Sequence, residues 1–471
     1  MNRPILHFTP VRNWMNDPNG LIYYGGNYHM FYQHFPYAMK WGTMHWGHAT
    51  SKDLLHWEHQ PIALFPTKSY DQDGCFSGSA IEVDEELYLF YTAVRYTEVD
   101  EEDVTVAKNG NFLAAQALII SKDGYNFDNF KDKYEVIPVM NEESFAHPIH
   151  TRDPKVWKEG DVYYMVLGTK VQTPGNQKTT PKLLFYRSYD AKQWEYMNDF
   201  SLYGELGDMW ECPDLFAVDG QYILAMSPEN CLNEVSLEPS HAMFGLIDFN
   251  QKDCLVSATG SVFRFIDYGL DYYAPQTMLD EKDRRVQFGW LRMKTPVAGE
   301  EWIGMMTLPR ILTVKAGHIY TTVHPNVTAL FSKAIYQLTD ITLSDMIAID
   351  ELVLEKPLYL KARMKNNGII LLGEYQINYQ NGMVIANRSK VMNGIEGQQV
   401  SQTPIIKKYQ EAKISGEEDN IICEVEIYID RCVVEIYIEQ GEYVISHVTK
   451  PLKGSIQSKQ IINFEGYTIE N

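Results

Sequence analysis

The sequence predicts an all-β protein: a five-bladed β-propeller over residues 1–316, a linker over 317–334 and a C-terminal β-sandwich over 335–471. Three observations predict this fold. Short runs rich in Tyr, Val, Ile and Phe fill the N-terminal two thirds, without a convincing long amphipathic helix. A weak repeat of roughly sixty residues divides that region into five units. Beyond it, apolar and polar residues alternate plainly.

The five N-terminal units share one plan, in which a small polar or proline-containing step opens a short strand, and a turn leads to a more apolar strand. The opening steps are Asp17-Pro18, Ser77-Gly78, Asp153-Pro154, Cys212-Pro213 and Ala274-Pro275. The apolar strands are expected at 28–32, 87–91, 162–167, 222–226 and 286–290. Five all-β units of this length predict a propeller. A β-sandwich is the alternative, but it gives no reason for the period. An acidic stretch at 98–103 is expected to be a loop insertion.

The C-terminal region shows the period of a half-buried antiparallel sheet. Cys423, Val425 and Ile427 fall on one face, and Val434 and Ile436 repeat the pattern after a turn. The region contains no candidate catalytic cluster.

Charge and cysteine content narrow the classes of partner. The formal charge is 41 − 62 = −21, which disfavours nucleic acid and anionic membranes and is compatible with a neutral sugar. No apolar signal core opens the chain, and no segment is long enough to span a bilayer. Six scattered cysteines without a CxxC pair indicate reduced thiols in a cytoplasmic protein.

Three acids occupy related positions in the repeat. Asp17 and Asp153 open the first and third units, and Glu211 stands one residue before Cys212-Pro213 in the fourth. Because equivalent positions of different blades converge on the propeller axis, we expect these acids to meet at one mouth of the funnel. Like charges raise at least one pKa, as a proton donor requires, and paired carboxylates are the machinery of glycoside hydrolysis. Arg152 can hold one carboxylate ionised. The alternative is that each acid satisfies backbone donors at a blade entrance.

A metal site is the competing interpretation of the N-terminal region, which is rich in histidine: His29, His34, His45, His48, His56 and His59. Two pairs are three residues apart on expected strands. An odd spacing places the two members of each pair on opposite faces of a strand, so we expect no metal site. No cofactor is expected either.

Several motifs resemble those of one enzyme family. Residues 14–20 (WMNDPNG), 152–154 (RDP) and 210–213 (WECP) resemble, in order and spacing, the signature motifs of the invertase-type β-fructosidases, glycoside hydrolase family 32. The segments 31–33, 41–42, 76–79, 271–276 and 308–310 fit as well. The stretch 430–437 resembles the family's sandwich signature, with Cys432 where Ser is more usual. The segments 96–150 and 229–240 match no pattern of the family.

The resemblance implies roles that spacing alone does not assign. Asp17 is implied to be the nucleophile, Glu211 the general acid and then the base, and Asp153 the stabiliser of the transition state. The residues implied to bind the fructosyl unit are Asn16, Gln33, Trp41, Phe76, Ser77, Arg152, Tyr273 and Trp290. Trp41 and Trp290 could instead be core aromatics, and Cys212 could tune Glu211 or merely pack.

The expected function is therefore a retaining β-fructofuranosidase that acts on sucrose, sucrose 6-phosphate or short fructo-oligosaccharides. The expected partner is a small-molecule fructoside, with no nucleic acid or membrane, and a homodimer is compatible with the sequence. Two other functions stay open. The same covalent intermediate could be captured by a sugar, which would make the protein a fructosyltransferase, or the propeller could bind sugar without catalysis.

Overall fold

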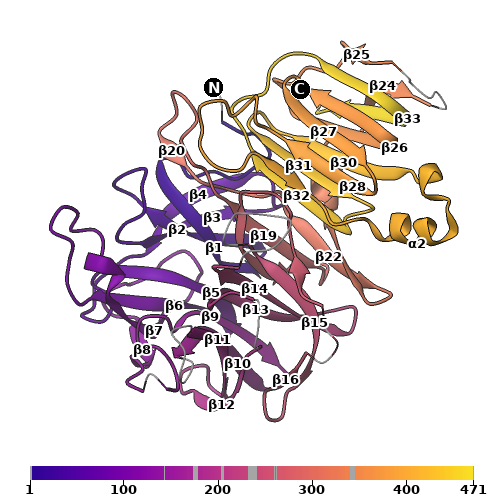
Figure 1. Ribbon diagram of the computed structural model, residues 1–471. Coiled ribbons are helices and arrows are strands. Elements are labelled where there is room, and N and C mark those ends of the chain that lie inside the picture. Colours follow the sequence, from indigo (N-terminus) through magenta and orange to yellow (C-terminus); the bar gives the residue numbers. More distant parts are fainter. Residues whose placement is uncertain are drawn as a thin grey trace.

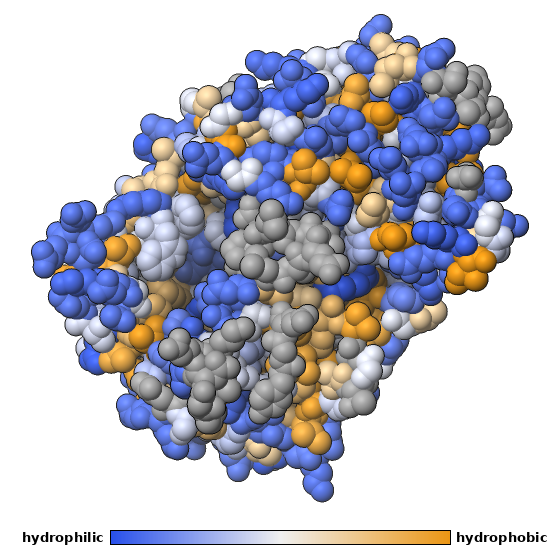
Figure 2. Space-filling model, viewed as in Figure 1, coloured by the Kyte–Doolittle hydropathy of each residue, from blue (hydrophilic) through white to orange (hydrophobic). Residues whose placement is uncertain are grey.

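The computed structural model describes residues 3–142, 144–172, 179–202, 206–231, 241–258, 260, 262–339 and 345–469. It consists of a five-bladed β-propeller followed by a β-rich domain at its side, and it confirms the predicted fold class (Figure 1). Most of the face seen in Figure 2 is hydrophilic, with apolar residues scattered over it.

The first two blades follow the predicted repeat. The first contains β1 (Asn13–Tyr24), β2 (Asn27–Phe35), β3 (His45–Ser51) and β4 (Trp57–Leu64). The second contains β5 (Gly74–Val83), β6 (Glu86–Tyr96), β7 (Phe112–Ser121) and β8 (Lys133–Ile137). The predicted acidic insertion lies between β6 and β7, where it includes a short 3-10 turn, η1 (Lys108–Gly110).

The other three blades complete the ring. The third contains β9 (Arg152–Glu159), β10 (Val162–Gln172), β11 (Thr179–Ser188) and β12 (Glu195–Phe200). The fourth contains β13 (Met209–Val218), β14 (Gln221–Glu229), β15 (Met243–Asn250), β16 (Leu255–Ser257) and β17 (Arg264–Phe265). The fifth contains β18 (Tyr272–Leu279), β19 (Arg285–Leu291), β21 (Met305–Met306), β22 (Arg310–Lys315) and β23 (His318–Val323).

The ring is closed by a strand that leaves the fifth blade. After β19 the chain forms β20 (Trp302–Ile303), which pairs in parallel with Asn13 and Trp14 of β1. The two ends of the propeller are thus held by backbone hydrogen bonds. Trp302 is fully buried at this junction.

The second domain is built around one long strand. β26 (Leu358–Leu372) pairs with β30 (Cys423–Ile429) through its first half, with β27 (Tyr375–Gln380) through its second half, and with β33 (Ile456–Thr468) along its other edge. The remaining strands are β24 (Ala334–Leu338), β25 (Ile347–Ile349), β28 (Met383–Asn387), β29 (Val400–Gln402), β31 (Val433–Ile438) and β32 (Tyr443–Val448). The layers enclose one apolar core that includes Leu360, Ile377, Ile427, Ile436 and Phe464.

Besides η1, three short helical segments interrupt the strands of the described chain, namely α1 (Pro325–Thr328), α2 (Lys407–Ser415) and the 3-10 turn η2 (Glu418–Asn420). Within the described residues, none of these has the length and apolar character needed to cross a membrane.

A strand of the fifth blade falls within the linker predicted over 317–334. β23 lies inside the predicted linker 317–334, but it pairs with β22 over its whole length and is the outer strand of the fifth blade. We therefore propose that the connection begins only at His324. The alternating residues Ile319, Thr321 and Val323 of β23 have the β-branched side chains that are common in strands.

A buried network of charges joins the two domains. Arg310 of the fifth blade donates to Glu435 of β31 at 2.8 Å and to Asp267 at 2.9 Å. His7 lies between Asp430 and Glu435, with each ring nitrogen 3.0 Å from a carboxylate oxygen. Since all these side chains are fully buried, their separation would leave charges unpaired inside the protein.

Candidate active site

The inner strand of every blade is irregular near its start. The pairing of β1, β5, β9, β13 and β18 with the neighbouring strand shifts next to the opening steps predicted from the repeat. Asp153, Cys212 and Ala274, each followed by proline, adopt positive φ values of 65°, 47° and 47°. Such β-bulges re-aim side chains out of the regular alternation. They allow consecutive residues of the inner strands to reach the axis.

These bulges surround a cavity of about 340 Å³ at the mouth of the propeller. The structure brings all eleven predicted site residues to its wall: Asn16, Asp17, Gln33, Trp41, Phe76, Ser77, Arg152, Asp153, Glu211, Tyr273 and Trp290. Three further side chains line the same cavity: Phe112, His150 and Glu229. The predicted convergence of the three acids is therefore what the geometry shows.

Asp17 is held by the first, second and fourth blades. Ser77 donates its hydroxyl to Asp17 Oδ2 at 2.5 Å, and Asn16 donates to Oδ1 at 3.1 Å. The thiol of Cys212 lies 3.5 Å from the same Oδ2. Burial is the main cause that raises the pKa of Asp17, with the charge of Glu211 adding to it, whereas the three hydrogen bonds oppose the shift.

Asp153 is buried, and its Oδ2 accepts a hydrogen bond of 2.8 Å from the backbone N–H of Cys212. Burial raises the pKa of Asp153 to about 7; adjacent Arg152 opposes the shift, and Glu211 adds to it. The expected like-charge effect on at least one acid is therefore present.

Glu211 is bound at both oxygens. Arg152 Nη2 donates to Oε1 at 2.8 Å, and the hydroxyl of Tyr273 donates to Oε2 at 2.7 Å. The same nitrogen of Arg152 lies 3.4 Å from Glu229. Arg152 thus connects the third blade to two carboxylates of the fourth, and the nearby carboxylates raise its pKa.

Aromatic rings form part of the cavity wall. The rings of Trp41 and Phe76 are 5.5 Å apart, and those of Phe76 and Phe112 are 5.6 Å apart, in edge-to-face contact. Trp290 packs against Trp14 at 5.9 Å. Trp41 is 36% exposed. An apolar wall facing polar groups suits a ring with one apolar face and several hydroxyls.

Sequence reasoning missed Phe112, His150 and Glu229, and it left the role of Cys212 open. Phe112 and His150 lie in the segment 96–150, and Glu229 is the first residue of the segment 229–240; neither segment matches a pattern of the family. Of the second segment, only Glu229, Asn230 and Cys231 are among the described residues. His150 stands two residues before Arg152, and this spacing was an available signal. Cys212 touches Asp17 by its thiol and Asp153 by its backbone.

The histidine-rich first blade is packed rather than open. His29 and His48 contact each other through ring nitrogens at 3.1 Å, and burial lowers the pKa of His29 to about 4. In the described part of the chain, no group of three or more His, Cys, Asp or Glu side chains is arranged to hold a metal ion.

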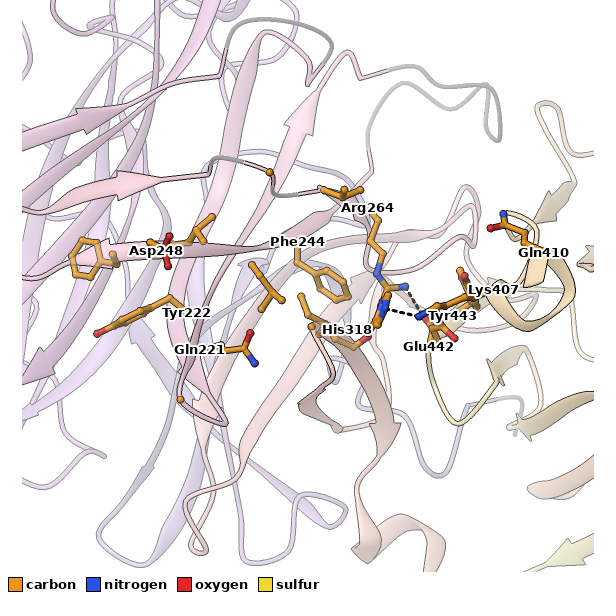
Figure 3. A pocket seen from close by; sticks show the side chains of 18 residues that line it. Gln221, Tyr222, Phe244, Asp248, Arg264, His318, Lys407, Gln410, Glu442 and Tyr443 are labelled. Carbon is orange, nitrogen blue, oxygen red and sulfur yellow. Dashed lines mark hydrogen bonds between the residues drawn. The ribbon is translucent and has the colours of Figure 1, made fainter. Parts of the chain in front are cut away.

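A larger hollow, of about 860 Å³, lies elsewhere, between the fourth and fifth blades and the second domain (Figure 3). It begins at the turn that follows β13, at the opposite end of that strand from Glu211. Arg264 crosses it and donates to the backbone oxygens of Glu442 and Ile319. None of the predicted site residues lines this hollow.

The chain matches the N-terminal domain of glycosyl hydrolases family 32 over residues 7–324 and the C-terminal domain of that family over residues 368–458. It is 34% identical to a raffinose invertase of Escherichia coli, over 96% of this chain and 90% of that protein. It is 32% identical to a sucrose-6-phosphate hydrolase of Escherichia coli, over 94% of this chain and 88% of that protein.

A solved β-fructofuranosidase of Bombyx mori superposes with a TM-score of 0.78 at 28% identity, covering 100% of this chain and 94% of the other. A sucrose-6-phosphate hydrolase of Lactobacillus gasseri has the same fold, with a TM-score of 0.82, 22% identity and coverage of 100% and 93%.

The chain belongs to glycosyl hydrolase family 32. It is a glycoside hydrolase of the β-fructofuranosidase type.

Proposed function

We propose that this enzyme releases terminal β-D-fructofuranosyl units by double displacement, with Asp17 as nucleophile, Glu211 as acid and base, and Asp153 as stabiliser of the transition state. The observation that carries the proposal is the meeting of these three carboxyl groups in one cavity with Arg152 and Tyr273. Two carboxyl groups that flank a glycosidic bond are the minimum machinery for its hydrolysis.

The hydrogen bonds around Asp17 support its role as nucleophile. Its two oxygens accept bonds from Asn16, Ser77 and the Cys212 thiol, and these favour the ionised form against the cost of burial. The carboxylate attacks the anomeric carbon of the fructosyl unit, and the bond to the leaving oxygen breaks. A fructosyl ester of Asp17 results.

Glu211 is placed to move the proton. In the first step it gives its proton to the leaving oxygen, and in the second it takes one from the water that attacks the ester. Arg152 and Tyr273 orient its carboxyl group through one bond to each oxygen.

Asp153 acts beside the reacting carbon. Its Oδ2 accepts a hydrogen bond from the backbone N–H of Cys212, which leaves Oδ1 as the oxygen to bind the fructose hydroxyls. Asn16, Gln33, Trp41, Phe76, Ser77, Arg152, Tyr273 and Trp290 complete the fructosyl pocket.

The substrates follow from the relatives. Those proteins are named for raffinose and for sucrose 6-phosphate, and a mutant of the Bombyx mori enzyme was solved with sucrose. All three are β-fructofuranosides, so they support the same class of substrate here. Incubation of the purified protein with sucrose tests the proposal: we expect equal release of glucose and fructose, and none from the Asp17→Asn variant.

A cytoplasmic location is part of the proposal. All six cysteines are buried thiols, as in a protein kept reduced. Fractionation of the source cells tests the location. A homodimer stays a prediction, and sedimentation equilibrium of the purified chain tests it.

A further inference from the structure

Glu229 and His150 line the catalytic cavity but have no part in the reaction proposed above. Glu229 is the last residue of β14. It pairs with Met209 of β13, while Glu211 pairs with Ser227. Paired residues, and residues two apart on a strand, share one face of a sheet. Glu229 and Glu211 therefore project from the same face of the fourth blade and are diagonal neighbours.

Glu229 lies nearer the cavity mouth than the proposed acid. The exposed fraction of the side chain rises from 9% for Arg152 to 23% for Glu211 and 32% for Glu229. Burial raises the pKa of Glu229; the charges of Glu211 and Asp208 add to the shift, and those of Arg152 and Lys170 oppose it. Because Asp17 faces the anomeric carbon and Glu211 the leaving oxygen, a group beyond Glu211 faces the leaving sugar.

His150 presents a hydrogen-bond donor in the same cavity, and it contacts the same guanidinium as Glu229. Arg152 Nη1 lies 3.0 Å from His150 Nδ1. A guanidinium has only donors, so Nδ1 must accept, and the ring proton resides on Nε2. Burial and the charges of Arg152 and Lys170 lower the pKa of His150 to about 2, so the ring stays neutral. Arg152 thereby sets the tautomer of His150 as well as the position of both glutamates.

We propose that Glu229 and His150 bind hydroxyl groups of the leaving sugar, and that the Glu229 carboxylate makes the site prefer an uncharged leaving sugar to a phosphorylated one. The inference rests on the proposed function and specifies its substrate. A carboxylate accepts from sugar hydroxyls and an N–H donates to them, which together match a diol. A phosphate dianion instead meets a negative charge, and like charges that face each other disfavour a partner.

The charged side chains that line the cavity support the same preference. Among the described residues that line it, Asp17, Asp153, Glu211 and Glu229 carry carboxyl groups, and Arg152 alone has a permanent positive charge. Arg152 is already shared by Glu211 and Glu229. Lys170 acts on Glu229 and His150 from nearby but does not line the cavity, so the lining offers a phosphate no unshared positive charge.

Three substrates separate the leaving sugar from the rest of the reaction: sucrose, sucrose 6-phosphate and methyl β-D-fructofuranoside, whose leaving group is only methanol. We expect the wild-type enzyme to favour sucrose over its 6-phosphate in kcat/KM by about 10-fold or more. Glu229→Gln should lower kcat/KM for sucrose by about 10-fold, as expected for the loss of a charged hydrogen bond. The same variant should change kcat/KM for the methyl fructoside by less than about 2-fold. It should also reduce the ratio of kcat/KM for sucrose to that for sucrose 6-phosphate.

Two variants of His150 test the donor. His150→Gln keeps an N–H that can reach the sugar and should retain most activity on sucrose. His150→Phe should lower kcat/KM for sucrose by about 5- to 10-fold and kcat/KM for the methyl fructoside by much less. The matched control is Glu135→Gln, at an exposed position of the outer strand β8, which should behave like wild type with all three substrates.

Two results would overturn the inference. One is a wild-type preference for sucrose 6-phosphate. The other is an equal loss by Glu229→Gln on sucrose and methyl fructoside, which would mean that Glu229 acts through Arg152 on the chemistry. If the wild-type enzyme releases fructose from none of the three substrates, the proposed function itself fails, and this outcome differs from both.

Discussion

Arg152 and Glu211 form an ion pair of 2.8 Å between the third and fourth blades, and Tyr273 binds the other oxygen of the same carboxylate. Both oxygens of the proposed acid are therefore occupied before a substrate enters. A carboxylic acid must release one of these contacts to carry a proton toward a leaving oxygen. Substrate binding is the event that can exchange such a contact, since Arg152 also has Glu229 within reach.

The first prediction separates nucleophile from acid. Asp17→Asn should abolish turnover because no carboxylate can form the ester. Glu211→Gln should lower the rate on sucrose by about 10²–10⁴-fold, the usual contribution of acid–base assistance. With an activated leaving group, Glu211→Gln should recover much of its first step, whereas Asp17→Asn should not. Near-normal turnover of sucrose by either variant would contradict the assignment, and circular dichroism controls for folding.

The second prediction concerns the buried charge of Asp153. Its pKa of about 7 in the folded state lies above that of an exposed Asp, so the folded protein binds this proton more tightly than the unfolded chain. This contribution to stability is complete at acidic pH and is lost as the pH rises through about 7. Asp153→Asn has no such loss. Its Tm relative to wild type should therefore rise between pH 5 and pH 8 in calorimetry, and a constant difference would contradict the shift.

The third prediction concerns His7 at the domain junction. Contacts with Asp430 and Glu435 outweigh burial and raise the pKa of His7 to about 9. The group stabilises the fold fully below about pH 6.5, and its contribution disappears as the pH rises through about 9. His7→Gln should destabilise the protein at pH 6 by roughly 3 kcal/mol, since it breaks a buried pair.

The destabilisation of His7→Gln should shrink at pH 9.5. Urea denaturation at both pH values measures it, with His56→Gln on an exposed turn as the control. If the destabilisation is equally large at pH 9.5, the stabilising effect of His7 does not depend on its protonation, and the prediction is wrong.

The fourth prediction is that the propeller depends on the second domain. A chain cut after Lys333 would leave Arg310 without Glu435 and Asp271 without Arg388, and it would expose the apolar surface around Leu308 and Phe331. We expect this fragment to aggregate on expression. Its yield in the soluble fraction and its activity on sucrose are the measurements, and a soluble, fully active fragment would show that the second domain is dispensable.

The repeat made much of the site predictable. In a propeller, equivalent positions of successive blades meet at the axis, so the location of Asp17, Asp153 and Glu211 near the opening steps was enough to expect their convergence. Their roles, and the wall residues Trp41 and Trp290, came from the family resemblance. The spacing of the repeat does not select these two tryptophans from the other aromatic residues.

Other features depend on register and could not be predicted. Glu229 reaches the cavity because it pairs with Met209 across a hairpin, and no local pattern gives that pairing. His7 meets Asp430 from a position 423 residues earlier in the chain. β23 was missed for a simpler reason: the domain boundary was placed at a change of pattern, although the residues after Gly317 still form a strand.

The stereochemistry of hydrolysis tests the double displacement at Asp17 most directly. A nucleophilic carboxylate stands about 5–5.5 Å from the acid and gives two displacements with net retention, whereas a gap of about 6.5–9.5 Å admits a water and gives inversion. Rapid NMR of sucrose hydrolysis should show β-D-fructofuranose as the first product, before mutarotation. If α-D-fructofuranose appears first, Asp17 activates water and forms no ester, and the mechanism proposed here is wrong.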